Sequence, residues 1–291
     1  SGAVKRVFTM KAKAMNACIV FAEELKSCTN VRYAPYDTLK ESRAELQELL
    51  EEEIKLQQIQ ELPMKMMQFV SLINPTDAIH AIDRIIDKRK DAILIHNSSF
   101  MTGLYYELSG LCQTENCLTI LAALEILKNR GYEISKKDYH TGFSDVCEMT
   151  GLMGRWQKLQ SYPDVICDTG HNADGFKCIR QQLNYIHNKL NQELHIVFGM
   201  VNDKDISSVL ELLPKDATYY FTKASVKRAL PEDELMKMAS EAGLKGTSYP
   251  TVADAVRAAK ENCPPKDFIF VGGSNFIVAD LLANRDTLNL Y

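Results

Sequence analysis

The chain has 291 residues, of which 46% are hydrophobic and 25% charged, with a formal net charge of −4. These values are typical of an ordinary soluble protein with room for two domains. They argue against a large nucleic-acid surface, which needs a basic stripe. No apolar run approaches the roughly 20 residues that cross a bilayer, and the first residues lack a signal-peptide core.

The eight cysteines are scattered singly and none forms a C-x-x-C pair. Such spacing favours free thiols in a reducing compartment over disulfides or a zinc site. We therefore expect a cytoplasmic protein with no membrane or nucleic-acid partner.

The N-terminal stretch predicts helices with little sheet. A basic helix is expected at 4–15 and a strand at 18–22, followed by charged helices at 37–62 and about 76–88. The strand-like run DAILIH comes next. The leucines of 37–62 keep a broken heptad, so the pattern favours a solvated helix that packs one stripe, with a coiled coil as the alternative.

Residues 114–150 read as further helices. Thr114 is a candidate N-cap, 118–127 provide an apolar face, and Gly131 is a C-terminal stop. Ser135 and Asp138 have the spacing of a capping box for the next helix.

From about residue 151 the pattern becomes regular, after the glycines of TGLMG (150–154). The short apolar runs DVIC, LHIVFG, ATYYFT and DFIFVGG read as buried parallel strands. Helical segments alternate with them, and the clearest, 173–190, carries apolar residues every three or four positions. The alternation predicts a doubly wound, mostly parallel α/β sheet whose ligands bind at the carboxyl ends of its strands.

The sequence CDTGHNADG (167–175) lies at such a strand–loop–helix junction. Asp168 can accept hydrogen bonds from a ribose diol, and His171 can donate to phosphate or carboxylate oxygens. The alternative is that the Asp and Asn side chains simply cap the helix. Arg155, in GRWQ, is a surface arginine by spacing alone, although its fork suits polyphosphate.

Other motifs are weaker candidates for a functional site. The glycines of VGGSN (271–275) either approach a ligand or allow tight packing, and GLKGTS (243–248) lacks the order of a phosphate-binding loop. The histidines have no metal-like spacing, and chain order assembles no Ser-His-Asp set.

Several motifs nevertheless occur together in one order. TGLMGRWQKL, VICDTGHNADG, HIVFGMVNDKD, YYFTKA and DFIFVGGSNFIVADLL together resemble the carboxy-terminal domain of the folylpolyglutamate synthase/dihydrofolate synthase family, in the Mur ligase group. Upstream, LSGLCQTENCLTILAALEIL is similar to the family's G-x-x-Q-x-x-N-x-x-T-x-L-A-A-L segment. VKRVFTMKAKAMNACIVFAEE resembles part of its central ATPase domain. The resemblance covers about 1–35 and 103–291.

The resemblance implies two domains. Residues 1–150 would be part of the central ATPase domain, helix-rich and interrupted by a charged helical insert at about 36–102. Residues 151–291 would be the domain that binds glutamate and ATP. The implied reaction is an ATP-dependent ligation in which a carboxylate of dihydropteroate or a folate becomes an acyl phosphate, which the amine of L-glutamate attacks. ATP and Mg²⁺ are the implied cofactors, and positioning and charge neutralisation supply most of the acceleration.

The resemblance also implies residue roles. Arg155 would contact ATP phosphates, and Asp168 the ribose side of the nucleotide. His171 would lie near the reacting phosphate and the incoming glutamate, which Ser274 would help to hold. Asn116 would face the adenine.

The chain departs from the family pattern in several places. A phosphate loop of the G-T-x-G-K-x-S kind is absent from the 291 residues, as are the magnesium-binding segments, which belong upstream. Cys112 stands where the family commonly has an aromatic residue or histidine, and 36–102 match no part of the pattern. We expect this chain to be a monomer that is inactive alone.

Two alternatives stay open at this point. The first is another Mur-type amide ligase, one that acts in cell-wall synthesis. The forms CDTGHN and NDKD favour the folate branch instead. The second is a non-catalytic binding module derived from the C-terminal domain, in which the charged segment recruits a partner.

Overall fold

The computed structural model describes residues 2–15, 30–34, 43–44, 47, 83, 92–97 and 101–290. The predicted strand at 18–22 and most of the two predicted charged helices lie outside these residues. Where those helices are described, at 43–44, 47 and 83, the backbone is helical. The Arg43 guanidinium Nε lies 2.8 Å from an Asp83 carboxylate oxygen, so an ion pair joins the two stretches. No described helix has the length and hydropathy needed to span a membrane.

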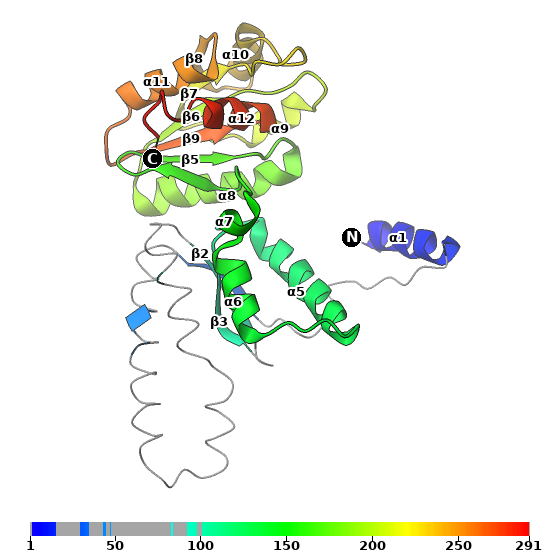
Figure 1. Cartoon of the computed structure of the whole chain (residues 1–291). Coiled ribbons are helices and arrows are strands. Elements are labelled where there is room, and N and C mark those ends of the chain that lie inside the picture. The colour runs from blue at the N-terminus through cyan, green and yellow to red at the C-terminus, as the bar shows by residue number, and fades with distance from the viewer. Residues whose placement is uncertain are drawn as a thin grey trace.

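The C-terminal part is built on a six-stranded sheet (Figure 1) with the order β4-β5-β9-β6-β7-β8. The strands are β4 (Gln157–Gln160), β5 (Asp164–Asp168), β6 (Leu194–Phe198), β7 (Ala217–Thr222), β8 (Lys245–Tyr249) and β9 (Phe268–Gly272). All pairs are parallel except β4 with β5. The four predicted buried strands are therefore confirmed, whereas the edge strand β4 was not predicted from its polar sequence QKLQ.

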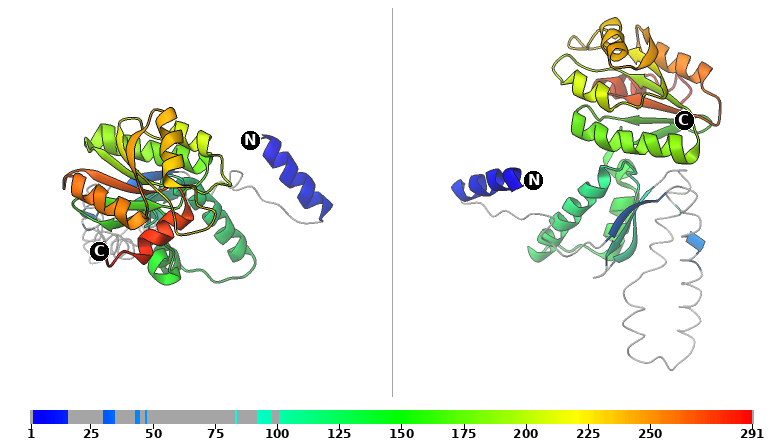
Figure 2. Two further views of the ribbon diagram at one scale, coloured as in Figure 1. Left: turned by 90° about the horizontal axis from the view of Figure 1, so that it is seen from above. Right: turned by 180° about the vertical axis from the view of Figure 1, so that it is seen from behind.

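Helices cover both faces of this sheet, as the views in Figure 2 show. One face packs against α8 (Ala173–Leu190), α9 (Ile206–Leu212) and α10 (Glu232–Glu241). The opposite face packs against α11 (Val252–Asn262) and α12 (Asn275–Ala283). Every residue of β6 and β9 is buried between these layers, because aliphatic and aromatic side chains point to both faces. The predicted doubly wound, mostly parallel fold is confirmed.

The N-terminal part contains a smaller antiparallel sheet of three strands. The described elements there are α1 (Gly2–Ala14), β1 (Asn30–Ala34), β2 (Ala92–Asn97), β3 (Met101–Tyr106), α5 (Gln113–Asn129), α6 (Lys136–Ser144) and α7 (Val146–Thr150). The run DAILIH forms β2 as predicted, so the stretch expected to be a helical insert ends in strands. The antiparallel pairing was not foreseen.

Helix boundaries in this part follow local hydrogen bonds. The capping box of α6 is confirmed, since the Ser135 side chain accepts from the Asp138 amide and the Asp138 carboxylate accepts from the Ser135 amide. The predicted N-cap of α5 at Thr114 is wrong. The N-cap is Cys112 and the helix begins at Gln113, two residues earlier than predicted, because a turn in which the Gln113 amide donates to the Gly110 carbonyl starts it. Thr114 instead donates its hydroxyl to the Leu111 carbonyl.

A buried amide joins the two parts. Gln182, in α8, is 2% exposed. Its Nε2 donates to the Ser109 carbonyl at 3.1 Å, and its Oε1 accepts from the Leu111 amide at 3.0 Å. We call the contacts of Gln182 with Ser109 and Leu111 the joint. It fixes the loop that leads into α5 against the C-terminal part.

Candidate functional site

The carboxyl ends of three central strands meet at one edge of the large sheet. β9 lies between β5 and β6, and Gly272 is in register with Asp168 on one side and Phe198 on the other. Beyond the strands, the Gly199 amide donates to the Gly272 carbonyl at 3.2 Å. The helices that follow β5 and β6 pack on one face, whereas α12, which follows β9, packs on the opposite face. Such a reversal is where doubly wound sheets bind ligands.

Asp168 at the end of β5 holds a folded loop in place. It is 6% exposed, and its two carboxylate oxygens accept from the Trp156 amide at 2.8 Å and the Gly170 amide at 2.7 Å. The Thr169 amide also donates to the Gly154 carbonyl at 2.9 Å. These bonds tie residues 154–156 to residues 168–170, and we call this arrangement the Asp168 corner.

Backbone strain in the corner explains why it needs such bonds. Gly154 has φ +75° and Trp156 has φ +46°, a conformation that is unfavourable for a bulky residue. The Trp156 side chain is buried among Phe268 and Phe270, with ring centroids 6.3 and 5.8 Å away. The carboxylate and the aromatic contacts together stabilise the turn that carries Arg155.

The corner places a cation beside a buried acid. Burial raises the pKa of Asp168, while the amides of Gly170 and Trp156 and the charge of Arg155 act in the opposite direction. Arg155 is exposed, and none of the ion pairs recorded among the described residues includes it. A guanidinium held in this way can bind the oxygens of a phosphate group through paired hydrogen bonds.

His171 follows the corner directly and is half-buried. Its Nδ1 lies 3.1 Å from the Thr169 carbonyl oxygen. Because a carbonyl only accepts, this contact requires the proton on Nδ1 and leaves Nε2 as the basic nitrogen. Asn172 accepts from the Gly175 amide at 2.8 Å and caps α8, so the capping alternative is confirmed for Asn172. Asp168 caps no helix.

Ser274 lies at the end of the neighbouring strand β9. It is 2% exposed and caps α12, accepting from the Phe276 amide at 3.2 Å. The preceding Gly273 has φ +102°, and a Cβ there would lie 2.5 Å from the Gly199 carbonyl oxygen. Tight packing, one of the two alternatives for VGGSN, is thus confirmed at Gly273, and close approach to a ligand stays a prediction.

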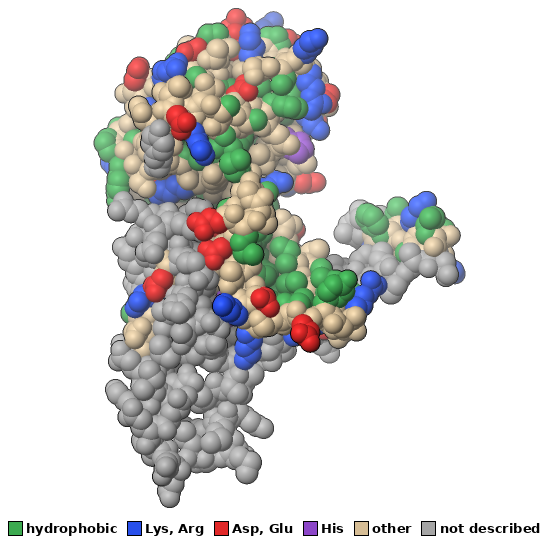
Figure 3. All heavy atoms as spheres, in the orientation of Figure 1, with side chains coloured by type: hydrophobic (Ala, Val, Ile, Leu, Met, Phe, Trp, Pro, Cys, Tyr) green, Lys and Arg blue, Asp and Glu red, His purple; other side chains and the backbone are tan. Residues whose placement is uncertain are grey.

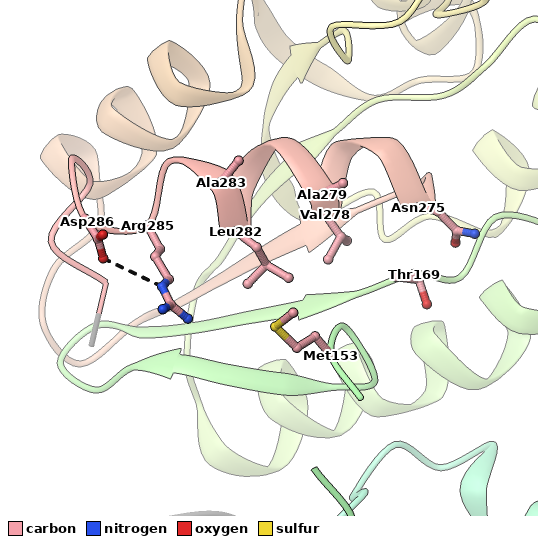
Figure 4. Close-up of a pocket in the computed structure, with 9 residues that line it drawn as sticks. All are labelled: Met153, Thr169, Asn275, Val278, Ala279, Leu282, Ala283, Arg285 and Asp286. Carbon is pink, nitrogen blue, oxygen red and sulfur yellow. Dashed lines mark ion pairs between the residues drawn. The ribbon is translucent and has the colours of Figure 1, made fainter. Parts of the chain in front are cut away.

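A hollow of about 650 Å³ lies along α12 next to these strand ends. Figure 4 shows Val278 and Leu282 of α12 on the side facing Met153, with Thr169 and Asn275 at one end of the hollow. Arg285 and Asp286 lie at the other end and form an ion pair at 3.6 Å. The hollow therefore has an apolar floor between two polar ends.

Asn116 belongs to the other part of the chain. It is exposed on the first turn of α5, and its Nδ2 donates to Gln113 Oε1 at 2.9 Å. The structure thus gathers Arg155, Asp168 and His171 in one corner and Ser274 on an adjacent strand end. The joint holds the loop before Asn116 against α8.

Sequence reasoning missed two residues that position this site. Gln182 is a polar residue on the buried stripe of α8, next to Leu183, and that position was the available signal. Trp156 was quoted only as a neighbour of Arg155, and nothing in its sequence context signals a positive φ. Within the described ranges, no group of three or more His, Cys, Asp and Glu side chains is arranged to hold a metal ion.

Comparison with known proteins finds similarities that include these residues. Residues 154–275 match the family model for the Mur ligase, glutamate ligase domain. The chain is 28% identical over 171 residues to a dihydrofolate synthase/folylpolyglutamate synthase of Buchnera aphidicola subsp. Schizaphis graminum, covering 58% of this chain and 39% of that protein. It is 26% identical over 224 residues to a UDP-N-acetylmuramoyl-L-alanyl-D-glutamate–2,6-diaminopimelate ligase of Buchnera aphidicola subsp. Baizongia pistaciae, covering 73% of this chain and 42% of that protein.

Solved structures share the fold. E. coli FolC in complex with DHPP and ADP matches with a TM-score of 0.55 and 24% identity, covering 69% of this chain and 44% of that chain. A bifunctional folylpolyglutamate synthase/dihydrofolate synthase with Mn, AMPPNP and L-glutamate bound matches with a TM-score of 0.52 and 22% identity, covering 68% and 44%. The chain spans less than half the length of each of these relatives.

Proposed function

Because residues 154–275 match the Mur ligase, glutamate ligase domain, we propose that the chain belongs to the folylpolyglutamate synthase/dihydrofolate synthase family and is part of an ATP-dependent ligase. The reaction would join L-glutamate to dihydropteroate, to a folylpolyglutamate, or to both, through an acyl phosphate. The observation that carries this proposal is the Asp168 corner, which holds an exposed arginine and a histidine at a central strand end within the matched residues.

Each predicted site residue would have a role that fits its surroundings. The Arg155 guanidinium would bind phosphate oxygens and offset their charge. Asp168 would face the ribose, although its first task is to hold the corner, since each carboxylate oxygen already accepts a backbone N–H. His171 Nε2 would lie close to the reacting phosphate and the amine of glutamate. Ser274 would donate its hydroxyl proton to glutamate, since its oxygen already accepts as the α12 cap.

The nucleotide and its metal are also proposals for this chain. The relative with AMPPNP, Mn and L-glutamate bound supports ATP and a divalent cation at the level of the family. The described residues fit the anionic part of ATP, because the corner supplies an exposed cation. We propose that the metal ligands lie outside the described residues, and that Asn116 would contact the adenine across the joint.

We further propose that residues 1–150 belong to the central ATPase domain and residues 151–291 to the glutamate-binding domain. The support is that each range has its own sheet and its own buried cluster. The chain would be a monomer that does not turn over substrates by itself.

The test is a turnover assay with the full-length gene product, ATP, L-glutamate, and either dihydropteroate or tetrahydrofolate. ADP release that depends on both the acceptor and glutamate is expected from the full-length protein, and no turnover from the 291-residue chain. Arg155→Ala should lower kcat/KM by roughly 10²-fold or more, as loss of a charge-stabilising donor does. The exposed Arg257→Ala is the matched control and should leave it unchanged. A silent full-length enzyme would count against the proposal.

A second candidate has one observation in its favour. The diaminopimelate-adding relative matches more of this chain than the dihydrofolate synthase relative does, although at 26% identity. Replacing the pterin acceptor by UDP-N-acetylmuramoyl-L-alanyl-D-glutamate, and glutamate by diaminopimelate, separates the two candidates. Turnover of neither set, together with a partner captured in light-scattering measurements, would point to a binding module instead.

A further inference from the structure

Two half-exposed cysteines from different parts of the chain meet beside the joint. Cys112 precedes α5, and Cys178 lies in α8, four residues before Gln182. Residues four apart lie on the same face of a helix, so Cys178 and Gln182 face the same loop. Because Gln182 Oε1 accepts from the Leu111 amide at 3.0 Å, the next residue in the chain, Cys112, lies close to this face of α8. Cys178 contributes to raising the pKa of the Cys112 thiol, which identifies the two thiols as neighbours.

This pair differs from the other described cysteines. Cys117, Cys167 and Cys263 are buried, which keeps reagents in solution away from them. Cys147 is half-exposed like the pair, but it lies at the start of the short helix α7. Cys112 and Cys178 therefore combine partial exposure with a second thiol nearby.

The two thiols are not equivalent. Burial, followed by the charge of a Cys178 thiolate, raises the pKa of Cys112 to about 12. Cys112 therefore keeps its proton at neutral pH. A thiolate is the attacking species in disulfide exchange, so Cys112, whose pKa is raised, would be the second of the two thiols to react.

We propose that Cys112 and Cys178 are a dithiol modification site, which a small-molecule disulfide oxidises to a cross-link between the 109–112 loop and α8. The Cys178 thiolate attacks the reagent's S–S bond and forms a mixed disulfide, releasing one reagent thiolate. Cys112 loses its proton to solvent, attacks Cys178 Sγ and releases the second reagent thiolate. The two protein thiols are oxidised, the reagent is reduced to two thiols, and the two protons end on these.

The cross-link would fasten the joint covalently. It would close the chain between residues 112 and 178 and so restrict the unfolded ensemble. In the folded protein it would fix α5 against α8. The inference stands on the joint and its thiols, and it does not depend on the proposed ligase activity.

The experiment treats the 291-residue chain with oxidised glutathione and maps peptides without reduction by mass spectrometry. The expected product joins the peptides that contain Cys112 and Cys178, without retained glutathione, and dithiothreitol reverses it. The oxidised protein should unfold at a higher temperature, by on the order of 5–10 °C. Mapping at the level of peptides separates this product from reactions at other cysteines.

Three variants decide the mechanism. Cys112→Ser should retain glutathione on Cys178, because no second thiol resolves the mixed disulfide. Cys178→Ser should leave Cys112 largely unmodified, and Cys147→Ser should form the cross-link as the unchanged protein does. Glutathione retained on both Cys112 and Cys178 of the unchanged protein, or neither residue modified, would overturn the proposal.

Discussion

The two parts of the chain differ in how fully their sheets are covered. In the C-terminal part, helices pack on both faces, and every residue of β6 and β9 is buried. In the N-terminal part, one smaller buried cluster joins β3 to α5 and α6. Large apolar side chains remain exposed there, including Tyr132 at 63% and Met149 at 66%. Figure 3 shows hydrophobic side chains gathered over α5 and α1 on the visible face.

This difference in burial indicates that the C-terminal part positions the N-terminal part. The C-terminal sheet has a complete core, so its strand ends form a rigid frame for the Asp168 corner. The described N-terminal part buries much less, and Gln182 of the C-terminal domain supplies two hydrogen bonds that hold its 109–111 loop. The C-terminal sheet therefore positions the Asp168 corner, whereas the position of Asn116 relative to that corner depends on the joint.

The largest expected effect comes from breaking the C-terminal core. Phe270 is fully buried beside Trp156. Phe270→Ala should lower the free energy of unfolding by about 3–5 kcal/mol, through lost transfer energy and a cavity. Trp156 is the single tryptophan of the sequence, so urea unfolding followed by its fluorescence reports on this core.

Phe8→Ala is the matched control for that change, since Phe8 is 58% exposed on α1. It should change the same free energy by no more than about 0.5 kcal/mol. Equal effects of the two variants would show that burial in the large sheet does not dominate the stability of the chain.

The next effect concerns the corner. Asn at position 168 offers one acceptor oxygen and an NH₂ group, so either the Trp156 or the Gly170 amide would face a donor. Asp168→Asn should lower the free energy of unfolding by about 2–3 kcal/mol, since hydrogen bonds to a charged group are among the stronger ones. Urea unfolding followed by Trp156 fluorescence measures it.

Asp164→Asn, at the other end of β5, controls for removal of the charge. Asp164 pairs with Lys158 at 2.8 Å, with side chains 31% and 23% exposed. The expected loss is no more than about 1 kcal/mol. If both variants lose the same amount, the carboxylate of Asp168 is not what holds the corner.

The fold of the C-terminal part was predictable because buried parallel strands produce continuous apolar runs. DFIFVGG and LHIVFG became β9 and β6, and the apolar stripe of 173–190 became α8. β4 was missed because QKLQ has no such run, and it is a strand only through pairing with β5. The antiparallel pairing of β1 with β2 depends on contacts distant in sequence, which local patterns do not encode.

The candidate site was predictable in part, because the apolar runs also locate the ends of the strands. Strand ends follow from the pattern, so Asp168 and Ser274 were correctly expected at one edge of the sheet. That the Asp168 carboxylate would point inward, to the Trp156 amide, depends on a positive φ at a tryptophan. No propensity predicts that conformation, because tertiary packing imposes it.

A third prediction separates the two parts at the joint. Gln182→Ala leaves the Ser109 carbonyl and the Leu111 amide without their side-chain partner. It should cost about 1–3 kcal/mol and speed amide hydrogen exchange at Leu111. Exchange followed by mass spectrometry measures it. The exposed neighbour Gln181→Ala is the control, and equal protection of Leu111 in both variants would show that the amide of Gln182 does not hold the loop.

The smallest expected effect compares the same cap in both parts. Ser135 caps α6 and Thr251 caps α11, each accepting from an aspartate amide three residues later and donating to its carboxylate. Ser135→Ala and Thr251→Ala should each cost about 1 kcal/mol. Thr251→Ala should lower the urea midpoint reported by Trp156, because α11 covers the large sheet.

Ser135→Ala should leave that midpoint in place and instead speed amide exchange in α6, because the N-terminal cluster is separate from the two C-terminal ones. If Ser135→Ala moves the Trp156 transition as far as Thr251→Ala does, the joint couples the two parts into one cooperative unit. Gln182 would then transmit stability between the parts as well as fix their geometry, and the double variant with Gln182→Ala should abolish the shift.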